Sequence, residues 1–320
     1  MPQETPGIFT KIGKATLYFG PLNSNARIAL NRFSGDIILE PGHTAKDPVG
    51  ALLGNRIAYL SSNGINQQNI ALLQTFAQFA QNIPNLQLKD SSGHTVDDPL
   101  GPGTHMLDLR KPEVKTLLTK VALSYVDGKN PQTKKYEGIF LDALESAIAL
   151  ENGNPNFYKG LVRANVASIQ DIAKNIKLSN PNNRVIVNGG LVRYAGKEAT
   201  FDALATIAKD PNIDGICVER QFSADRNGED SRSYTLDRVG TAIRAALNAG
   251  KKRFSILALE ADSFDITADQ QAAAAFWQQL LAPLQATTRT KGAHIEIYPV
   301  CCENYTSYAS ITEQAEVAIA

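Results

Sequence analysis

The sequence predicts a single α/β domain, folded as a (β/α)8 TIM barrel over residues 1–320. Two observations carry this prediction. Short apolar runs of strand length alternate with segments of helical periodicity, which is typical of a parallel sheet covered by helices. A chain of 320 residues is also long enough for one complete barrel. An open, doubly wound sheet is the alternative that the same alternation allows.

Eight apolar runs are candidate strands, because Gly, Pro or polar residues that mark turns bound most of them. They comprise residues 15–20, 35–42, 56–62, 137–142, 184–190, 213–219, 253–260 and 294–300. Between them, apolar residues recur at the spacing of helices that bury one face. The predicted helices comprise residues 24–33, 70–80, 111–126, 156–176, 201–209, 236–249, 267–281 and 305–318.

Several helix boundaries carry sequence signals. Pro112 suits the first turn of a helix, and Gly250 suits the left-handed residue that ends one. Residues 84–110 instead contain clusters of Asp, Ser, Gly and Pro. A connection this irregular inside a compact barrel is more often a functional loop than a linker. We therefore expect an irregular loop insertion at this point of the barrel.

The composition narrows the range of partners. Thirty-two basic and thirty-two acidic residues cancel, so no long-range field favours nucleic acid or an anionic membrane. No apolar run reaches the roughly 18 residues that would predict a membrane span. The three cysteines cannot form a disulfide framework, and the four histidines lack the spacing of metal ligands. We expect neither a metal site nor a cofactor.

The first residues show no recognisable targeting signal. Residues 1–7 lack the basic and apolar segments of a signal peptide. This start fits either a cytoplasmic protein or a mature form whose leader has been removed. The sequence does not reveal the oligomeric state.

Two predicted strands end in a carboxylate after the same local pattern. Residues 136–142 read Tyr-Glu-Gly-Ile-Phe-Leu-Asp, and residues 213–219 read Ile-Asp-Gly-Ile-Cys-Val-Glu. Because the carboxyl ends of barrel strands share one face, Asp142 and Glu219 are expected to meet there. Paired carboxylates carry out glycoside hydrolysis. The structural alternative is that Asp142 only caps the helix that follows it.

Other side chains near strand ends are candidate substrate contacts. Asn188 ends the fifth strand, and its amide can bind a sugar hydroxyl. Glu260 ends the seventh strand and can contact substrate or pair with an Arg. Tyr59 and Tyr298 can stack on a sugar or simply fill the barrel rim.

Asp108 and Arg110 close the irregular segment just before a predicted helix. They can line the pocket, although a residue in this position is as often a helix cap.

An ordered series of motifs resembles the endo-α-1,4-polygalactosaminidase family and its glycosidase-like relatives. The motifs are Tyr59-Leu60-Ser61 with Gly64, Leu107-Asp108-Leu109-Arg110, Gly138-Ile139-Phe140-Leu141-Asp142, Val187-Asn188, Glu219 and Glu260. The resemblance implies a (β/α)8 barrel that hydrolyses α-linked amino sugar polymers with two acids. It places those acids at Asp142 and Glu219. It also suggests an extracellular or cell-surface location, while a cytoplasmic one stays open.

The chain departs from the family pattern at two points. The family usually continues the fourth strand as Asp-Asn-Val-Asp, whereas this chain has Asp142-Ala143-Leu144-Glu145. Glu145 thus stands in place of the second Asp and is a further candidate substrate contact. The third-strand motif often carries Glu soon after its Gly, where this chain has Ile65 and Asn66.

These observations lead to one functional hypothesis. The protein is predicted to hydrolyse a carbohydrate polymer or oligosaccharide, with Asp142 as nucleophile and Glu219 as acid/base, since the longer Glu reaches the leaving oxygen. The reverse assignment stays open. The first alternative is a catalytically inactive barrel that binds glycan or has a structural role. An aldolase or a phosphate-ester enzyme is disfavoured, because no strand end carries a Lys and no Gly-rich loop follows the eighth strand.

Overall fold

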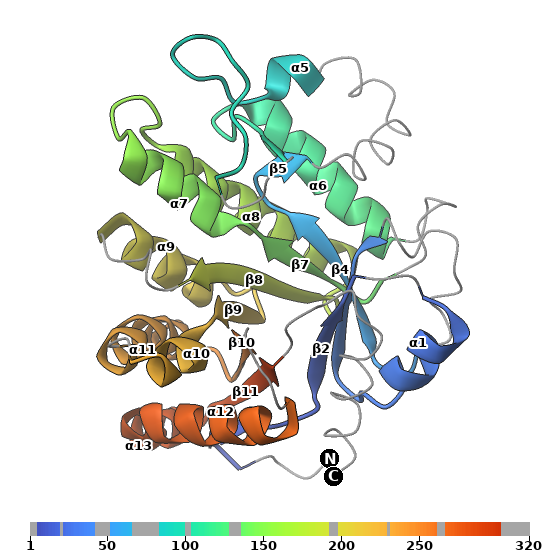
Figure 1. Cartoon of the computed structure of the whole chain (residues 1–320), viewed down its shortest axis with the longest axis vertical. Coiled ribbons are helices and arrows are strands. Elements are labelled where there is room, and N and C mark those ends of the chain that lie inside the picture. The colour runs from blue at the N-terminus through green and yellow to red at the C-terminus, as the bar shows by residue number, and fades with distance from the viewer. Residues whose placement is uncertain are drawn as a thin grey trace.

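Nine parallel strands form one sheet in a computed structural model of the protein (Figure 1). The structure describes residues 5–19, 22–41, 52–65, 83–99, 104–127, 136–191, 198–228, 231–260 and 266–301. The order across the sheet is β1-β11-β10-β9-β8-β7-β4-β3-β2. The strands are β1 (Gly7–Thr10), β2 (Ala15–Tyr18), β3 (Asp36–Leu39), β4 (Asn55–Ser61), β7 (Gly138–Asp142), β8 (Arg184–Leu191), β9 (Gly215–Glu219), β10 (Arg253–Glu260) and β11 (His294–Cys301).

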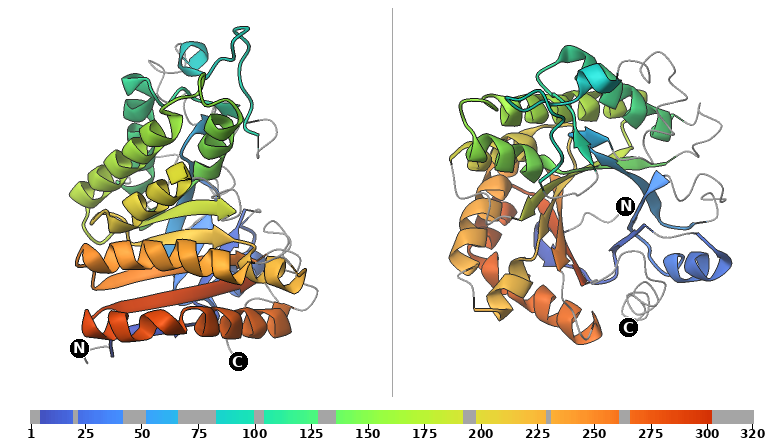
Figure 2. Two further views of the ribbon diagram at one scale, coloured as in Figure 1. Left: turned by 90° about the vertical axis from the view of Figure 1, so that its left-hand side faces the viewer. Right: turned by 45° about the horizontal axis from the view of Figure 1, so that its top comes forward.

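The sheet is curled as in a (β/α)8 barrel. It bends until β2, at one edge, comes beside β11 near the other, and Figure 2 shows this curvature from a second direction. All eight predicted strands are present, from β2 to β11. The short β1 was not predicted, and it adds a ninth strand by pairing in parallel with β11. The predicted fold class is therefore confirmed.

The strands bury apolar side chains on both faces, which is why their sequences read as continuous apolar runs. The cluster inside the barrel comprises Ala15, Leu17, Ile38, Ile57, Phe140, Ile186, Cys217, Leu257, Leu259 and Val300. A larger cluster lies between the sheet and the helices, and Trp277 is among its fully buried side chains. The inner cluster fills the middle of the barrel, so inward-facing polar side chains lie near the two ends of the strands.

Helices cover the outer face of the sheet (Figure 1). The helical elements of the described residues are α1 (Ser24–Leu30), α5 (Ile83–Leu86), α6 (Pro112–Val126), α7 (Leu144–Gly153), α8 (Leu161–Ser179), α9 (Glu198–Lys209), α10 (Gln221–Arg226), α11 (Arg232–Asn248), α12 (Ile266–Leu280), the 3-10 turn η3 (Ala282–Leu284) and α13 (Gln285–Thr290). The short α5 lies in the insertion, beyond the strand ends. Pro112 begins α6 and Gly250 takes a positive φ after α11, as predicted. The predicted helices 70–80 and 305–318 lie outside the described residues.

The predicted insertion between β4 and β7 has local order in its described part. Strands β5 (Gly64–Ile65) and β6 (His105–Met106) pair antiparallel, and isolated bridges join Gln87 to Leu107 and Lys89 to Thr95. This small ladder lies beyond the end of β4, on the side of the barrel where β7 also ends (Figure 1).

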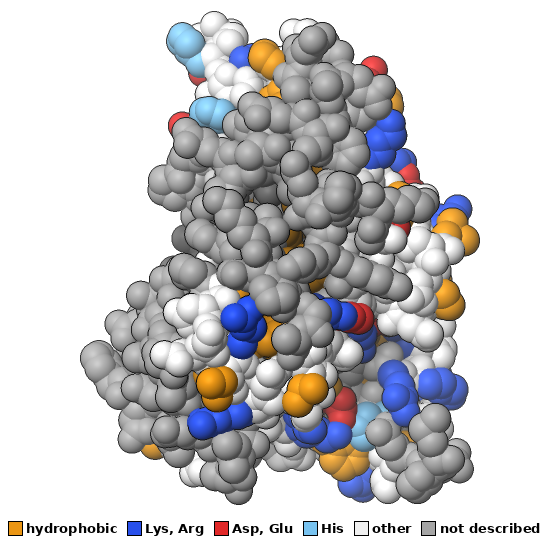
Figure 3. Space-filling model, turned by 90° about the vertical axis from the view of Figure 1, so that its right-hand side faces the viewer, with side chains coloured by type: hydrophobic (Ala, Val, Ile, Leu, Met, Phe, Trp, Pro, Cys, Tyr) orange, Lys and Arg blue, Asp and Glu red, His pale blue; other side chains and the backbone are white. Residues whose placement is uncertain are grey.

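Charges of both signs are mixed with apolar side chains on the described part of the face in Figure 3. Within the described residues, no helix combines the length and the apolar character needed to cross a membrane.

Candidate active site

Asp142 is the last residue of β7, and the pleat directs it to the inside of the barrel above Phe140. Strand β7 begins with Gly138, which packs closely against β8, because a Cβ at this position would stand 2.4 Å from the carbonyl oxygen of Arg184. The Tyr59 hydroxyl on β4 donates a 2.7 Å hydrogen bond to Asp142 Oδ2. Burial and the charge of Asp142 keep the pKa of Tyr59 well above its usual value, so this hydroxyl stays protonated.

Glu219 ends β9 in the same way, above the buried Cys217. Its pKa is raised, first by burial and then by the charge of Asp142, while a hydrogen bond from Asn188 and the charge of Arg220 oppose the rise. The two acids are thus near enough to influence each other. A carboxyl whose pKa is raised by burial fits a proton donor better than a nucleophile.

Asn188 links the two acids. Its Nδ2 nitrogen donates to Asp142 Oδ1 at 2.7 Å and to Glu219 Oε1 at 2.6 Å. Since both bonds start at one nitrogen, the two oxygens cannot be further apart than these lengths placed end to end, about 5.3 Å. The Asn188 side chain is 2% exposed, and its own Oδ1 accepts the backbone N–H of Gly190 at 2.9 Å. A buried amide therefore holds both carboxylates at the same end of the barrel.

A bulge in β8 allows this arrangement. The pairing of β8 with β9 shifts register between Asn188 and Leu191, and Gly190 takes a φ of +68°. A Cβ at Gly190 would lie 1.8 Å from Glu145 Oε2, so only glycine lets the carboxylate of Glu145 lie against this turn. Bulges often re-aim side chains beside active sites.

The residue that follows each acid has a left-handed backbone conformation. Ala143 has a φ of 70° and Arg220 a φ of 57°, and among the described residues they are the only non-glycine positions with positive φ. Each leads directly into a short helix, α7 or α10, without a side-chain cap. Side chains disfavour this conformation, and such strain is concentrated at functional sites. The turn after Asp142 is held by Ser62, whose N–H donates to the Asp142 carbonyl at 2.8 Å, and by the Asn63 amide, which donates to the Ala143 carbonyl.

The structure gathers five of the nine predicted site residues. Asp142, Glu219, Asn188 and Tyr59 are joined by hydrogen bonds, and Glu145 lies against Gly190 beside them.

Asp108 and Arg110 lie apart from this group, paired with each other at 2.8 Å. Arg110 also donates to the Phe157 carbonyl at 3.1 Å, which ties it to the segment after α7. Both residues follow β6, in the insertion beyond the strand ends.

Two placements correct the sequence interpretation. Glu260 is 1% exposed, and its carboxylate accepts hydrogen bonds from the backbone of α10, so it faces the helices rather than the opening. Tyr298 pairs in register with Leu257, one layer below Glu219, and its hydroxyl donates to Glu296. Tyr298 lines a cavity of about 280 Å³ at the amino end of the strands, opposite the acids.

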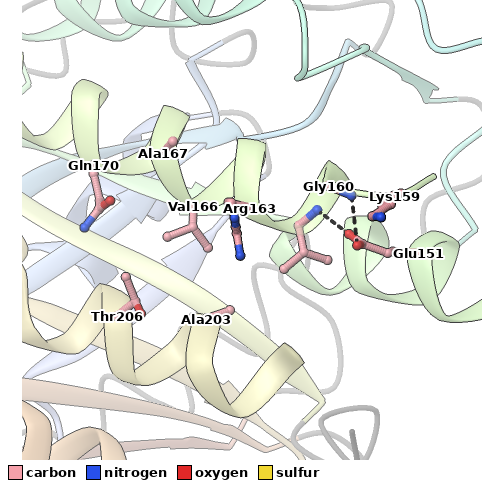
Figure 4. A pocket seen from close by; sticks show the side chains of 10 residues that line it. Glu151, Lys159, Gly160, Arg163, Val166, Ala167, Gln170, Ala203 and Thr206 are labelled. Atoms are coloured by element: carbon pink, nitrogen blue, oxygen red, sulfur yellow. Dashed lines mark hydrogen bonds between the residues drawn. The ribbon is translucent and has the colours of Figure 1, made fainter. Parts of the chain in front are cut away.

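The larger described cavity also lies away from the acids. It has a volume of about 530 Å³ and lies between α8 and α9 on the helical layer, with Glu151 of α7 at one end (Figure 4). The Glu151 carboxylate caps the start of α8, since it accepts hydrogen bonds from the N–H groups of Gly160 and Val162. Among the described residues, no group of three or more His, Cys, Asp or Glu side chains is arranged to hold a metal.

The fold is similar to that of known protein structures. The glycoside hydrolase domain of PelA from Pseudomonas aeruginosa superimposes with a TM-score of 0.51 at 17% identity, covering 89% of this chain and 94% of that one. A variant of that domain gives the same TM-score at 16% identity. The likeness identifies the fold. It confirms a barrel fold like that of the PelA glycoside hydrolase domain.

Aspergillus fumigatus Ega3, solved in complex with galactosamine, is more distant, with a TM-score of 0.45 at 12% identity over 85% of this chain and 86% of that one. No protein-family model matches the sequence, and no curated protein matches it either.

Proposed function

We propose that this protein is a glycoside hydrolase that uses Asp142 as nucleophile and Glu219 as general acid/base. The observation that carries the proposal is the single Asn188 nitrogen within hydrogen-bond distance of both carboxylates. Two acids held this close across one opening can flank a single glycosidic bond. The shared barrel fold of the PelA glycoside hydrolase domain supports the same conclusion.

The distance between the Asp142 and Glu219 carboxyl groups favours hydrolysis that retains the configuration of the anomeric carbon. Retaining enzymes place their carboxyl groups roughly 5 to 5.5 Å apart, whereas inverting enzymes need about 6.5 to 9.5 Å to admit a water molecule. The limit of about 5.3 Å between the nearest oxygens of Asp142 and Glu219 agrees with the shorter class. This geometry supports a covalent glycosyl-enzyme intermediate on Asp142.

The surroundings of the two acids support different roles. Asp142 accepts hydrogen bonds from Tyr59 and Asn188, and such bonds stabilise a carboxylate in its charged form. The pKa of Glu219 is raised, with burial as the largest cause, so its protonated form is favoured. Neighbouring carboxyls whose environments differ in this way divide into a charged nucleophile and a protonated acid.

The chemical steps follow from these roles. Asp142 attacks the anomeric carbon while the bond to the leaving oxygen breaks and Glu219 gives that oxygen its proton. Glu219, now charged, then takes a proton from water, and the resulting hydroxide attacks the same carbon and releases Asp142. Both carboxyl groups return to their starting states.

An amino sugar polymer with α-linkages is the proposed substrate. The ordered motifs of the sequence support it, and so does the charge of the site. Asp142, Glu145 and Glu219 all act to raise the pKa of the buried Cys217, so three carboxyl groups lie around this end of β9. A negative opening attracts a sugar that carries an ammonium group.

The experiment is a screen of amino sugar and neutral polymers with the wild type, Asp142→Asn and Glu219→Gln. We expect the wild type to release reducing ends from at least one α-linked amino sugar polymer. Each variant should lower kcat by roughly a hundredfold to ten-thousandfold, the range for removal of acid/base or nucleophilic groups. Asp214→Asn, at the other end of β9, is the matched control and should keep its kcat.

A wild type that binds these polymers without cleaving any of them would contradict the proposal. It would favour a glycan-binding barrel without activity.

A further inference from the structure

Glu260 is a buried acid that the catalytic scheme does not use. It is the last residue of β10, and it is 1% exposed. Its neighbour Leu259 pairs with Glu219 and belongs to the cluster inside the barrel, so alternation turns Glu260 outward toward the helices. This position excludes contact with a substrate in the opening.

The carboxylate of Glu260 is bonded to the first turn of α10. Oε1 accepts the N–H of Phe222 at 3.1 Å, and Oε2 accepts both the N–H and the hydroxyl of Ser223 at 3.1 Å. Burial raises the pKa of Glu260, while the hydrogen bonds from Phe222 and Ser223 and the indole of Trp277, on α12, oppose the rise. The carboxylate thus accepts three hydrogen bonds from the first turn of α10.

Charged groups on the packed elements are engaged elsewhere. Arg226 of α10 pairs with Asp269 of α12, and Arg232 of α11 pairs with Asp225 of α10. Across the described part of the chain, no basic side chain forms an ion pair with Glu260. An acid buried without a counter-ion is costly, so its placement calls for a reason.

The segment that Glu260 holds is the one that directs Glu219. Only Arg220 and Gln221 separate Glu219 from Phe222, and Arg220 is in the left-handed conformation. The Gln221 amide donates to the Glu219 carbonyl at 2.5 Å, and its oxygen accepts the Thr235 hydroxyl at 2.5 Å. The side chains of Gln221 and Thr235 are both buried.

We propose that Glu260 is a positioning residue for Glu219, which it aims into the opening by anchoring the first turn of α10; this inference rests on the proposed function. Helix α10 has six residues and no side-chain cap, and a helix this short does not hold itself in place. Without the anchor, the strained turn at Arg220 relaxes, and the Glu219 carboxyl moves relative to Asp142. Small misplacements of this kind lower turnover severely.

The test compares Glu260→Gln and Glu260→Ala with the wild type. Gln keeps one acceptor but sets an amide NH2 against the donors of α10, and Ala removes both acceptors. We expect kcat to fall about tenfold for Gln and about a hundredfold for Ala, with KM changed less than about threefold. In carboxyl carbon NMR spectra, the raised pKa of Glu219 should move toward its usual value, because a displaced side chain gains solvent.

Two further variants separate positioning from general stability. Gln221→Leu removes the bond to the Glu219 carbonyl without touching Glu260, and it should change kcat and the Glu219 pKa in the same direction. Asp214→Asn removes a carboxylate that accepts the Val185 N–H at the other end of β9. This control should lose stability while the kcat and the Glu219 pKa stay as in the wild type.

Amide hydrogen exchange gives a readout that needs no substrate. Protection of residues 221–226 should be lost in both Glu260 variants and kept in Asp214→Asn. If the wild type cleaves no polymer, the proposed function fails, while the exchange data and the Glu219 pKa still decide the positioning role. Folded Glu260 variants with an unchanged Glu219 pKa and unchanged protection of α10 would overturn the inference. If the Glu260 variants do not fold, an unchanged Glu219 pKa in Gln221→Leu would overturn it as well.

Discussion

Replacing Asn188 with Leu tests the link between the two acids. Leu has nearly the same size but cannot donate, so both bonds to the carboxylates are lost. Hydrogen bonds to charged groups contribute about 1.5 to 3 kcal/mol each, so we expect the free energy of unfolding to fall by roughly 3 to 6 kcal/mol at pH 8. The loss should be smaller at pH 5, because a proton shared by Asp142 and Glu219 can replace the amide between them.

The assay is urea unfolding followed by circular dichroism at both pH values. Asn165→Leu is the matched control, because Asn165 is also fully buried and its amide has no hydrogen-bond partner among the described residues. That variant should be neutral or more stable, since it removes an unsatisfied buried amide. A loss below about 1 kcal/mol for Asn188→Leu, or an equal loss at both pH values, would refute the link.

Three other predictions follow from strain and buried charge. In thermal unfolding, Ala143→Gly should be more stable than the helix control Ala147→Gly by about 1 to 2 kcal/mol, because of these two residues only Ala143 has a positive φ. Equal free energies of unfolding for the two variants would contradict the strain at Ala143. Burial raises the pKa of Glu260 from 4.5 to about 7, so the native state holds this proton more tightly and the free energy of unfolding should fall by about 3 kcal/mol between these pH values. Glu260→Gln should lack that slope, and an identical slope would contradict the assignment. Glu219 must be protonated to act as the acid, and its pKa is raised, so kcat/KM should fall as pH rises through that pKa. A kcat/KM profile that does not fall on its basic side would exclude Glu219 as the acid.

The sequence predicted the barrel because each main strand is an uninterrupted apolar run between turn residues. All eight strands were placed within a few residues of their observed bounds. The acids were found for the same reason, since Asp142 and Glu219 stand where apolar character ends. Parallel topology then brings strand ends that are far apart in sequence to one face.

Other elements lacked a local signal. Helices α7 and α10 were missed because Ala143 and Arg220 give no capping side chain at their starts. The strand β1 has four residues and lies at the sheet edge, so its pattern is too short to recognise. These elements depend on tertiary contacts rather than on local preference.

The errors at Glu260 and Tyr298 have different physical causes. Strand β10 is buried on both faces, so its sequence does not alternate and does not show that Glu260 points outward. Glu260 differs from Leu259 by one step of the pleat, and Tyr298 lies one layer below Val300. Only the register across the sheet reveals these positions.

The most direct test of the account is proton NMR of the first product released from a cleaved α-linked polymer. Asp142 and Glu219, linked by Asn188, predict that the new reducing end appears first as the α-anomer and then equilibrates. Initial release of the β-anomer would show that water attacks directly, and it would contradict the close pairing of the two carboxylates.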